Sequence, residues 1–104
     1  MSKYGTYAVT QSQSDSLALV KLVDSKGGAE VRIVPGIGNM AYSFLVDDEE
    51  LLWFPFHSPA ELKAKPALCG VPFLAPWANR IGGDAYWANG KRYLFNAELG
   101  NLHR

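Results

Sequence analysis

The chain has 104 residues, 48% hydrophobic and 19% charged, which is the balance of a folded domain and excludes a disordered or collagen-like chain. Ten Lys and Arg residues balance ten Asp and Glu residues, whereas a protein that binds nucleic acid normally carries a basic excess. The length predicts one domain over residues 1–104. The sole cysteine, Cys69, allows neither an internal disulfide nor a cysteine-rich metal site.

No targeting or membrane segment is expected. Residues 1–16 are polar and lack the apolar core of a signal peptide. The longest apolar run, residues 51–56, is far shorter than the about 20 residues of a membrane-spanning helix. These features predict a soluble, cytoplasmic protein that contacts no membrane. Residues 1–15 are rich in Ser and Gln, so we expect a polar, frayed N-terminus there.

Short apolar segments separated by turn residues follow one another from residue 17. Residues 17–23 predict a strand that ends at a Gly-rich turn. Residues 29–34 alternate apolar and charged side chains, which is typical of a half-buried strand. Two further strands are expected at residues 41–46 and 51–54, joined by an acidic turn at residues 47–50. We expect that turn to be a solvated hairpin tip rather than a cation site, because it lacks the spacing of a calcium loop.

Prolines interrupt residues 55–72, where we expect only a short helical turn with Ser58 as N-cap and Pro59 at the first helical position. This segment also holds His57, which we expect to be structural or exposed to solvent, and Cys69. Because no base accompanies Cys69 in the sequence, a buried, inert thiol is favoured over a nucleophile.

The Asn-Gly pair at residues 89 and 90 is the strongest hairpin signal in the chain. A type I′ turn there pairs Trp87 with Arg92 and Tyr86 with Tyr93. No segment shows a sustained helical period, and turn signals recur along the sequence. Together these patterns predict an all-β fold, arranged as an antiparallel sandwich or barrel.

The segment GVPFLAPWANRIGG surrounds Arg80 with Gly, Pro and aromatic residues. A guanidinium presents five donors in a rigid fork, which suits vicinal hydroxyls or a carboxylate. Asn79 both donates and accepts hydrogen bonds, as a pair of sugar hydroxyls requires. An apolar wall for a pyranose face could come from Trp77, Tyr86 and Trp87. The alternative is that Arg80 ends a strand and the aromatic residues form an ordinary core.

The part GVPFLAPWANRI resembles the N-terminal signature of the aldose 1-epimerases, or galactose mutarotases. The residues that match the family pattern are Gly70, Pro72, Pro76, Asn79, Arg80 and Ile81, then Gly90, Tyr93, Asn96, Leu102 and His103. Residues 28–31 and 35–38 are similar to the opening strands of that family, so the resemblance covers nearly the whole chain. It implies a truncated antiparallel β-sandwich of galactose-mutarotase type, and a family reaction that interconverts the α and β anomers of an aldohexose such as glucose or galactose.

The resemblance also implies residue roles. Asn79 and Arg80 bind the sugar, and His103 either corresponds to the sugar-contacting histidine or lies near its position, because Arg104 stands where the family has Gly. No metal and no cofactor is expected. No residue of this sequence matches the family's general acid, a histidine, or its general base, a glutamate. We therefore expect no catalytic residue in this chain and no activity from the chain alone.

Two other interpretations stay open: a non-catalytic carbohydrate-binding or interaction module, and a fragment without an independent role. An aldohexose is the expected small-molecule partner, and no nucleic acid is expected. The chain is formally neutral, and a sandwich cut partway leaves strand edges uncovered. The sequence therefore also predicts self-association through those edges.

Overall fold

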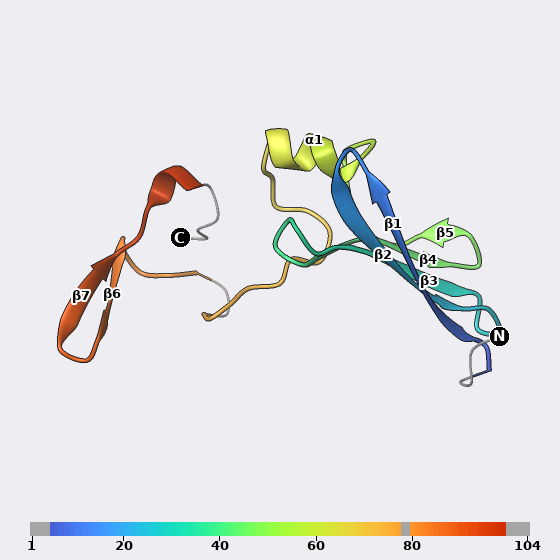
Figure 1. Cartoon of the computed structure of the whole chain (residues 1–104), viewed down its shortest axis with the longest axis horizontal. Coiled ribbons are helices and arrows are strands. Elements are labelled where there is room, and N and C mark those ends of the chain that lie inside the picture. The colour runs from blue at the N-terminus through green and yellow to red at the C-terminus, as the bar shows by residue number, and fades with distance from the viewer. Residues whose placement is uncertain (1–4, 78–79, 100–104) are drawn as a thin grey trace. The chain divides into compact units, whose positions relative to one another are not determined.

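The computed structural model describes residues 5–77 and 80–99. Contacts divide the chain into two compact units, Met1–Phe73 and Leu74–Arg104, and the single domain expected over residues 1–104 stays a prediction. The regular secondary structure described in both units is mainly antiparallel strand (Figure 1). Helix is limited there to α1 (Pro59–Ala64) and the 3₁₀ turn η1 (Ala97–Leu99). The prediction of an antiparallel, all-β chain is confirmed. No helix within the described ranges is long and apolar enough to cross a membrane.

The first unit is built on a five-stranded sheet in which each strand pairs with its neighbours in the sequence. Every pairing is antiparallel, so the chain runs up and down across the sheet (Figure 1). Its strands are β1 (Tyr7–Ser14), β2 (Leu17–Asp24), β3 (Ala29–Val34), β4 (Met40–Val46) and β5 (Glu49–Glu50). The strands predicted at residues 17–23, 29–34 and 41–46 therefore form.

Within residues 1–15, for which the sequence suggested a frayed N-terminus, residues 7–14 form the strand β1, and residues 1–4 lie outside the described residues. The strand pairs with β2 over all 8 of its residues. A two-residue turn joins the strands, with Asp15 and Ser16 at φ 51° and 64°, as a type I′ hairpin requires. Beyond the other end, the Thr6 carbonyl accepts a hydrogen bond from the Ser25 amide at 3.0 Å. Polar side chains did not prevent pairing, because an edge strand needs little burial of its own.

The core of the first unit lies on one face of the sheet. Its buried members are Val34, Met40, Leu62 and Cys69, and Val34 has no exposed surface. Leu62 comes from α1, so this short helix helps to cover the sheet. Partly buried side chains complete the core: Leu17, Leu19, Ile37, Tyr42, Phe54 and Phe56.

The opposite face of the sheet carries an apolar row. Register places Val9 opposite Leu22, Leu22 opposite Val31, and Val31 opposite Phe44. None of these residues belongs to the core cluster, and Val9 and Leu22 keep 67% and 39% of their surface exposed. A groove of about 310 Å³ lies on this row and is lined by Val9, Leu22 and Val31 among others. No described element of the first unit packs over this face as α1 packs over the other.

The prediction of a strand at residues 51–54 is wrong, because β5 ends at Glu50. The Glu50 carboxylate accepts hydrogen bonds from the amides of Phe44 and Leu52, at 2.8 and 3.0 Å. Further along, the Trp53 carbonyl accepts from the Gly70 amide at 2.8 Å. The Leu51 amide still donates to the Phe44 carbonyl of β4 at 2.9 Å, but beyond it the Leu52 amide is bound by a side chain and the Trp53 carbonyl by the Gly70 segment, so the pairing with β4 ends there. Apolar character alone could not distinguish these arrangements.

The predicted helical turn forms as α1, which begins at Pro59 with extended backbone at Ser58. The Ser58 side chain makes no capping hydrogen bond, so its predicted N-cap role is only positional. In its place, Glu61 Oε2 accepts a hydrogen bond from the His57 amide at 2.9 Å. This contact fixes the entry of the chain into the helix.

The second unit contains the hairpin of β6 (Ala85–Ala88) and β7 (Lys91–Leu94). Asn89 and Gly90 occupy the turn with φ of 52° and 72°, the left-handed pair of a type I′ turn. Trp87 lies opposite Arg92, and Tyr86 lies opposite Tyr93. The predicted hairpin and its register are confirmed.

Candidate functional site

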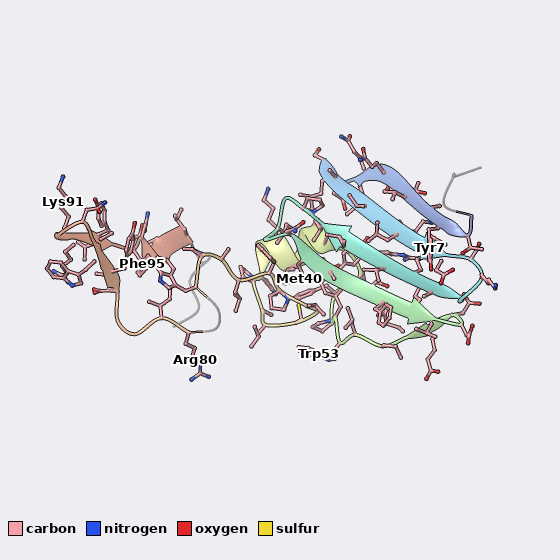
Figure 2. The ribbon with its side chains drawn as sticks, turned by 90° about the horizontal axis from the view of Figure 1, so that it is seen from below. Tyr7, Met40, Trp53, Arg80, Lys91 and Phe95 are labelled. Carbon is pink, nitrogen blue, oxygen red and sulfur yellow. The ribbon has the colours of Figure 1, made fainter. Side chains whose placement is uncertain are left out.

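Arg80 is the one predicted sugar-binding residue that the structure describes. It lies outside the strands of the second unit, five residues before β6 begins, and its side chain is exposed. Figure 2 shows this side chain extending away from the ribbon. Within residues 5–77 and 80–99, no carboxylate forms an ion pair with it. The other two predicted residues, Asn79 and His103, lie outside the described residues.

An aromatic cluster organises the same unit. Its members are Trp77, Tyr86, Tyr93 and Phe95. The Tyr86 ring is central: its centroid lies 5.0 Å from Trp77, 5.1 Å from Tyr93 and 5.5 Å from Phe95. Trp77 also meets Phe95 edge-on, at 5.4 Å and 90°. Stacked and edge-to-face pairs of this kind are the favoured aromatic geometries.

Trp87 does not join this cluster. Successive strand residues point to opposite faces, so Trp87 lies on the other face of the hairpin from Tyr86. It is 71% exposed. Of the three aromatic residues predicted to form a wall, the structure therefore brings together only Trp77 and Tyr86. Two members of the cluster were missed, Tyr93 and Phe95. The hairpin register contained the signal for both, since Tyr93 lies opposite Tyr86 and Phe95 follows two residues later.

The aromatic cluster combines packing with an open surface. Tyr86 and Phe95 are half-buried, whereas Trp77 and Tyr93 each keep 38% of their surface exposed. The half-buried rings hold the hairpin to the preceding segment. The exposed parts of Trp77 and Tyr93 offer flat apolar area of the kind on which the C–H face of a sugar ring packs.

A second arginine of this unit has a different setting. Arg92 lies on β7, and its Nη2 is 3.7 Å from Asp84 Oδ1. Both side chains are more than half exposed, so the pair contributes little to stability. Arg92 thus provides a natural comparison for Arg80: the same charge in the same unit, but engaged by a carboxylate and outside the GVPFLAPWANRI segment.

A row of charged and polar side chains crosses the sheet of the first unit. Glu30 pairs with Arg32 at 2.5 Å and with Lys21 at 3.9 Å. At the end of the row, the Ser43 hydroxyl donates to Glu50 at 2.5 Å. Burial acts to raise the pKa of Glu50, but the hydrogen bonds from Ser43 and two backbone amides, together with the Arg32 charge, hold it below its ordinary value of 4.5. These groups satisfy one another, so we interpret the row as structural.

The remaining reactive side chains do not assemble into a catalytic group. His57 is exposed. Cys69 is 5% exposed, and burial raises its pKa, which makes it the inert thiol that the sequence predicted. Asp47 and Asp48 form an exposed turn before β5. Among the residues that the structure describes, no three His, Cys, Asp or Glu side chains are placed to hold a metal ion.

Comparison of the chain with models of protein families, with curated proteins and with solved structures finds no match. The antiparallel fold class therefore stands on the geometry of the strands. The resemblance of residues 70–81 to the aldose 1-epimerases stays a prediction from the sequence.

Proposed function

We propose that this chain is an aldose 1-epimerase-like protein that binds an aldohexose such as glucose or galactose through Arg80, with Asn79 and His103. One observation carries the proposal: the Arg80 guanidinium is exposed in the unit that also holds the aromatic cluster. The resemblance of residues 70–81 to the family signature supports the same residues. The accompanying fold is a β-sandwich of galactose-mutarotase type, to which β1–β5 contribute one sheet.

The chemistry of a neutral sugar fits these groups. A guanidinium fork donates to two adjacent hydroxyl oxygens at once, and charged donors make stronger hydrogen bonds than neutral ones. The exposed parts of Trp77 and Tyr93 supply apolar area for the ring. No metal and no organic cofactor is needed for binding of this kind.

The family reaction sets limits on what these residues can do. Interconversion of the anomers removes a proton from the C1 hydroxyl and delivers one to the ring oxygen, so it needs groups that exchange protons. Guanidinium and amide side chains, the groups of Arg80 and Asn79, are not proton-exchanging groups in proteins. In this proposal both residues hold and orient the sugar, and neither is a catalytic acid or base.

A non-catalytic carbohydrate-binding module is the second candidate. It is favoured by the groups on which the proposed site depends, because Arg80 and the aromatic cluster bind a sugar without transferring protons. His57, the histidine that the structure describes, belongs to the first unit. The two candidates share the sugar site and differ only in catalysis.

Titration of the 104-residue chain with glucose and galactose, followed by the NMR signals of the tryptophan indole N–H groups, tests the site. Hydrogen bonds to charged groups contribute about 1.5–3 kcal/mol, so we expect Arg80→Ala to weaken binding roughly tenfold or more. The matched control Arg92→Ala removes the same charge from the same unit and should leave the affinity unchanged. Equal affinities for the Arg80→Ala variant and the unchanged chain, or no binding by the unchanged chain, would contradict the proposal.

A further inference from the structure

Strand β1 forms one edge of the five-stranded sheet, and its only pairing among the described residues is with β2. The two-residue turn fixes which backbone groups that pairing uses. Ser14 and Leu17 flank the turn and form a hydrogen-bonded pair, so the even-numbered residues of β1 bond to β2. The contact from Ser25 to the Thr6 carbonyl agrees with this pattern. The amides and carbonyls of the odd-numbered residues point outward, away from β2.

This edge lacks the features that protect most exposed strands. Proteins usually shorten an edge strand, place Lys or Pro on it, or distort it with a bulge. β1 has 8 residues, YAVTQSQS, with no charge and no Pro, and its register with β2 is unbroken. The opposite edge of the same sheet contrasts with it, because β5 has 2 residues and both are Glu.

We propose that two copies of this chain associate through β1, which pairs with its own counterpart in antiparallel orientation about a two-fold axis at Thr10. In this register, Tyr7 lies opposite Gln13 of the second copy, and Val9 lies opposite Gln11 of the second copy. Every outward amide and carbonyl of these four residues then has a partner. Sliding one strand by two residues leaves some of these groups unpaired, so the register centred on Thr10 pairs the largest number of outward amides and carbonyls.

The side chains of β1 favour a second copy of this chain as its partner. No charge lies on β1, and the formal charge of the whole chain is zero, so like charges do not oppose pairing with itself. Tyr7 and Val9 are 60% and 67% exposed and lie on the apolar face of the sheet. In the paired β1 strands, Val9 is diagonal to Val9 of the second copy, about 7–8 Å away, so the apolar rows of the two sheets approach each other at this position. This association is independent of the proposed sugar site.

A cysteine at the two-fold axis tests the register directly. The two Thr10 residues form a non-hydrogen-bonded pair, whose Cα atoms lie about 4.5 Å apart, within the range of a disulfide. We expect Thr10→Cys to form a covalent dimer under mild oxidation. Ser12→Cys is the matched control, because in this register its two copies are displaced by four residues, roughly 13 Å along the strand. The unchanged chain, in which Cys69 is buried, should not cross-link.

A proline at an outward position tests whether the edge itself is used. Gln11→Pro removes an outward amide that makes no bond to β2, and edge strands accept Pro at such positions. In sedimentation velocity we expect concentration-dependent dimers for the unchanged chain and for Gln11→Ala, which keeps the amide, and loss of the dimer for Gln11→Pro. Far-UV circular dichroism checks that the strands persist.

Three results would overturn the proposal. The first is an unchanged chain that stays monomeric at every concentration, which would leave the edge to a different protein or to solvent. The second is a Gln11→Pro variant that dimerises as the unchanged chain does. The third is cross-linking of Ser12→Cys as fast as that of Thr10→Cys, which would refute the register even if Gln11→Pro failed to fold.

Discussion

Tyr86 and Tyr93 stack across the second hairpin, with ring centroids 5.1 Å apart and planes inclined by 16°. They are directly opposite in the register of β6 and β7. Tyr86 also contacts Trp77 and Phe95, so one side chain links both strands to the segment before the hairpin and to the residue after it. A small unit without a fully buried side chain among its described residues depends heavily on such a hub.

Tyr86→Ala should therefore destabilise the hairpin locally. Aromatic pairs contribute about 0.5–1.5 kcal/mol each beyond the area they bury, and this change removes three of them. We expect faster amide hydrogen exchange in β6 and β7 and loss of the near-ultraviolet circular dichroism of the aromatic rings. Trp87→Ala is the control, because Trp87 is 71% exposed on the other face. Equal exchange in the two variants would show that the cluster does not hold the hairpin.

Local chemistry explains why this hairpin could be predicted and β1 could not. The Asn-Gly pair selects one turn type, and that turn fixes the register of every residue beside it. In β1 the turn is formed by Asp15 and Ser16, which adopt positive φ less readily than Gly, so the sequence gives a weaker signal. The polar residues after Val9 also resemble a loop. The alternation of residues 29–34, by contrast, was a direct sign of a strand.

The candidate site could be predicted only in part. Residue chemistry and the family resemblance pointed to Arg80, and its exposure in the structure leaves the guanidinium accessible to a ligand. Predicting which rings join the aromatic cluster required the register of the hairpin. Trp77, Tyr86 and Trp87 are close in sequence, but strand alternation places Trp87 on the opposite face from Tyr86. The inertness of the Cys69 thiol rests on its burial in the structure, because the sequence alone does not show whether a thiol reaches solvent.

Gly70 should be intolerant of a side chain. Its φ is +60°, and a Cβ there would lie 2.6 Å from the Ala41 carbonyl oxygen and 3.3 Å from Met40 Sδ. That carbonyl accepts a hydrogen bond from the Val71 amide at 2.8 Å, so the backbone cannot move away without breaking the bridge that holds this segment to β4. The left-handed conformation alone costs an L-residue about 1–2 kcal/mol.

We therefore expect Gly70→Ala to lower the free energy of unfolding by more than about 1–2 kcal/mol, as measured by urea denaturation. Gly36→Ala is the matched control, because a Cβ at that position would meet its nearest neighbour, Leu17 Cδ2, at an ordinary 3.9 Å. A Gly70→Ala variant as stable as Gly36→Ala would mean that the Val71 bridge does not contribute to the fold.

Glu50 should make the first unit sensitive to acid. Its pKa lies below 4.5 in the folded chain because the hydrogen bonds from Ser43, Phe44 and Leu52 and the charge of Arg32 outweigh the effect of burial. A carboxyl with a lowered pKa stabilises the fold fully above its ordinary value, and this contribution is lost as the pH falls through the lowered pKa. Stability should therefore decrease as the pH falls below 4.5.

Glu50→Gln should reduce that dependence, because a carboxamide does not titrate in this range. We expect the variant to be less stable than the unchanged chain at neutral pH, and the difference to narrow on acidification. Thermal melts across the acid range measure both effects. Glu49→Gln, at the neighbouring exposed position, should leave the pH profile close to that of the unchanged chain. A profile altered equally by both substitutions would indicate a general effect of charge.

The last prediction concerns catalysis. General acid–base catalysis contributes typically about 10²–10⁴-fold, and it requires a group that gives up a proton and a group that supplies one, both within reach of the sugar. A guanidinium is not a proton-exchanging group in proteins. We therefore expect the 104-residue chain to bind glucose or galactose without accelerating the interconversion of their anomers above the buffer rate. Polarimetry on freshly dissolved α-D-glucose measures that rate.

Variants of the two histidines make this measurement decisive. A catalysed rate that His103→Ala abolishes and His57→Ala leaves intact would show that His103 exchanges protons with the sugar. The interpretation of the chain as a protein that binds the sugar without its own acid and base would then be wrong, and the epimerase candidate would be favoured over the non-catalytic module. If the chain does not exceed the buffer rate and Arg80→Ala weakens sugar binding, the proposed site binds the sugar but does not transfer its protons.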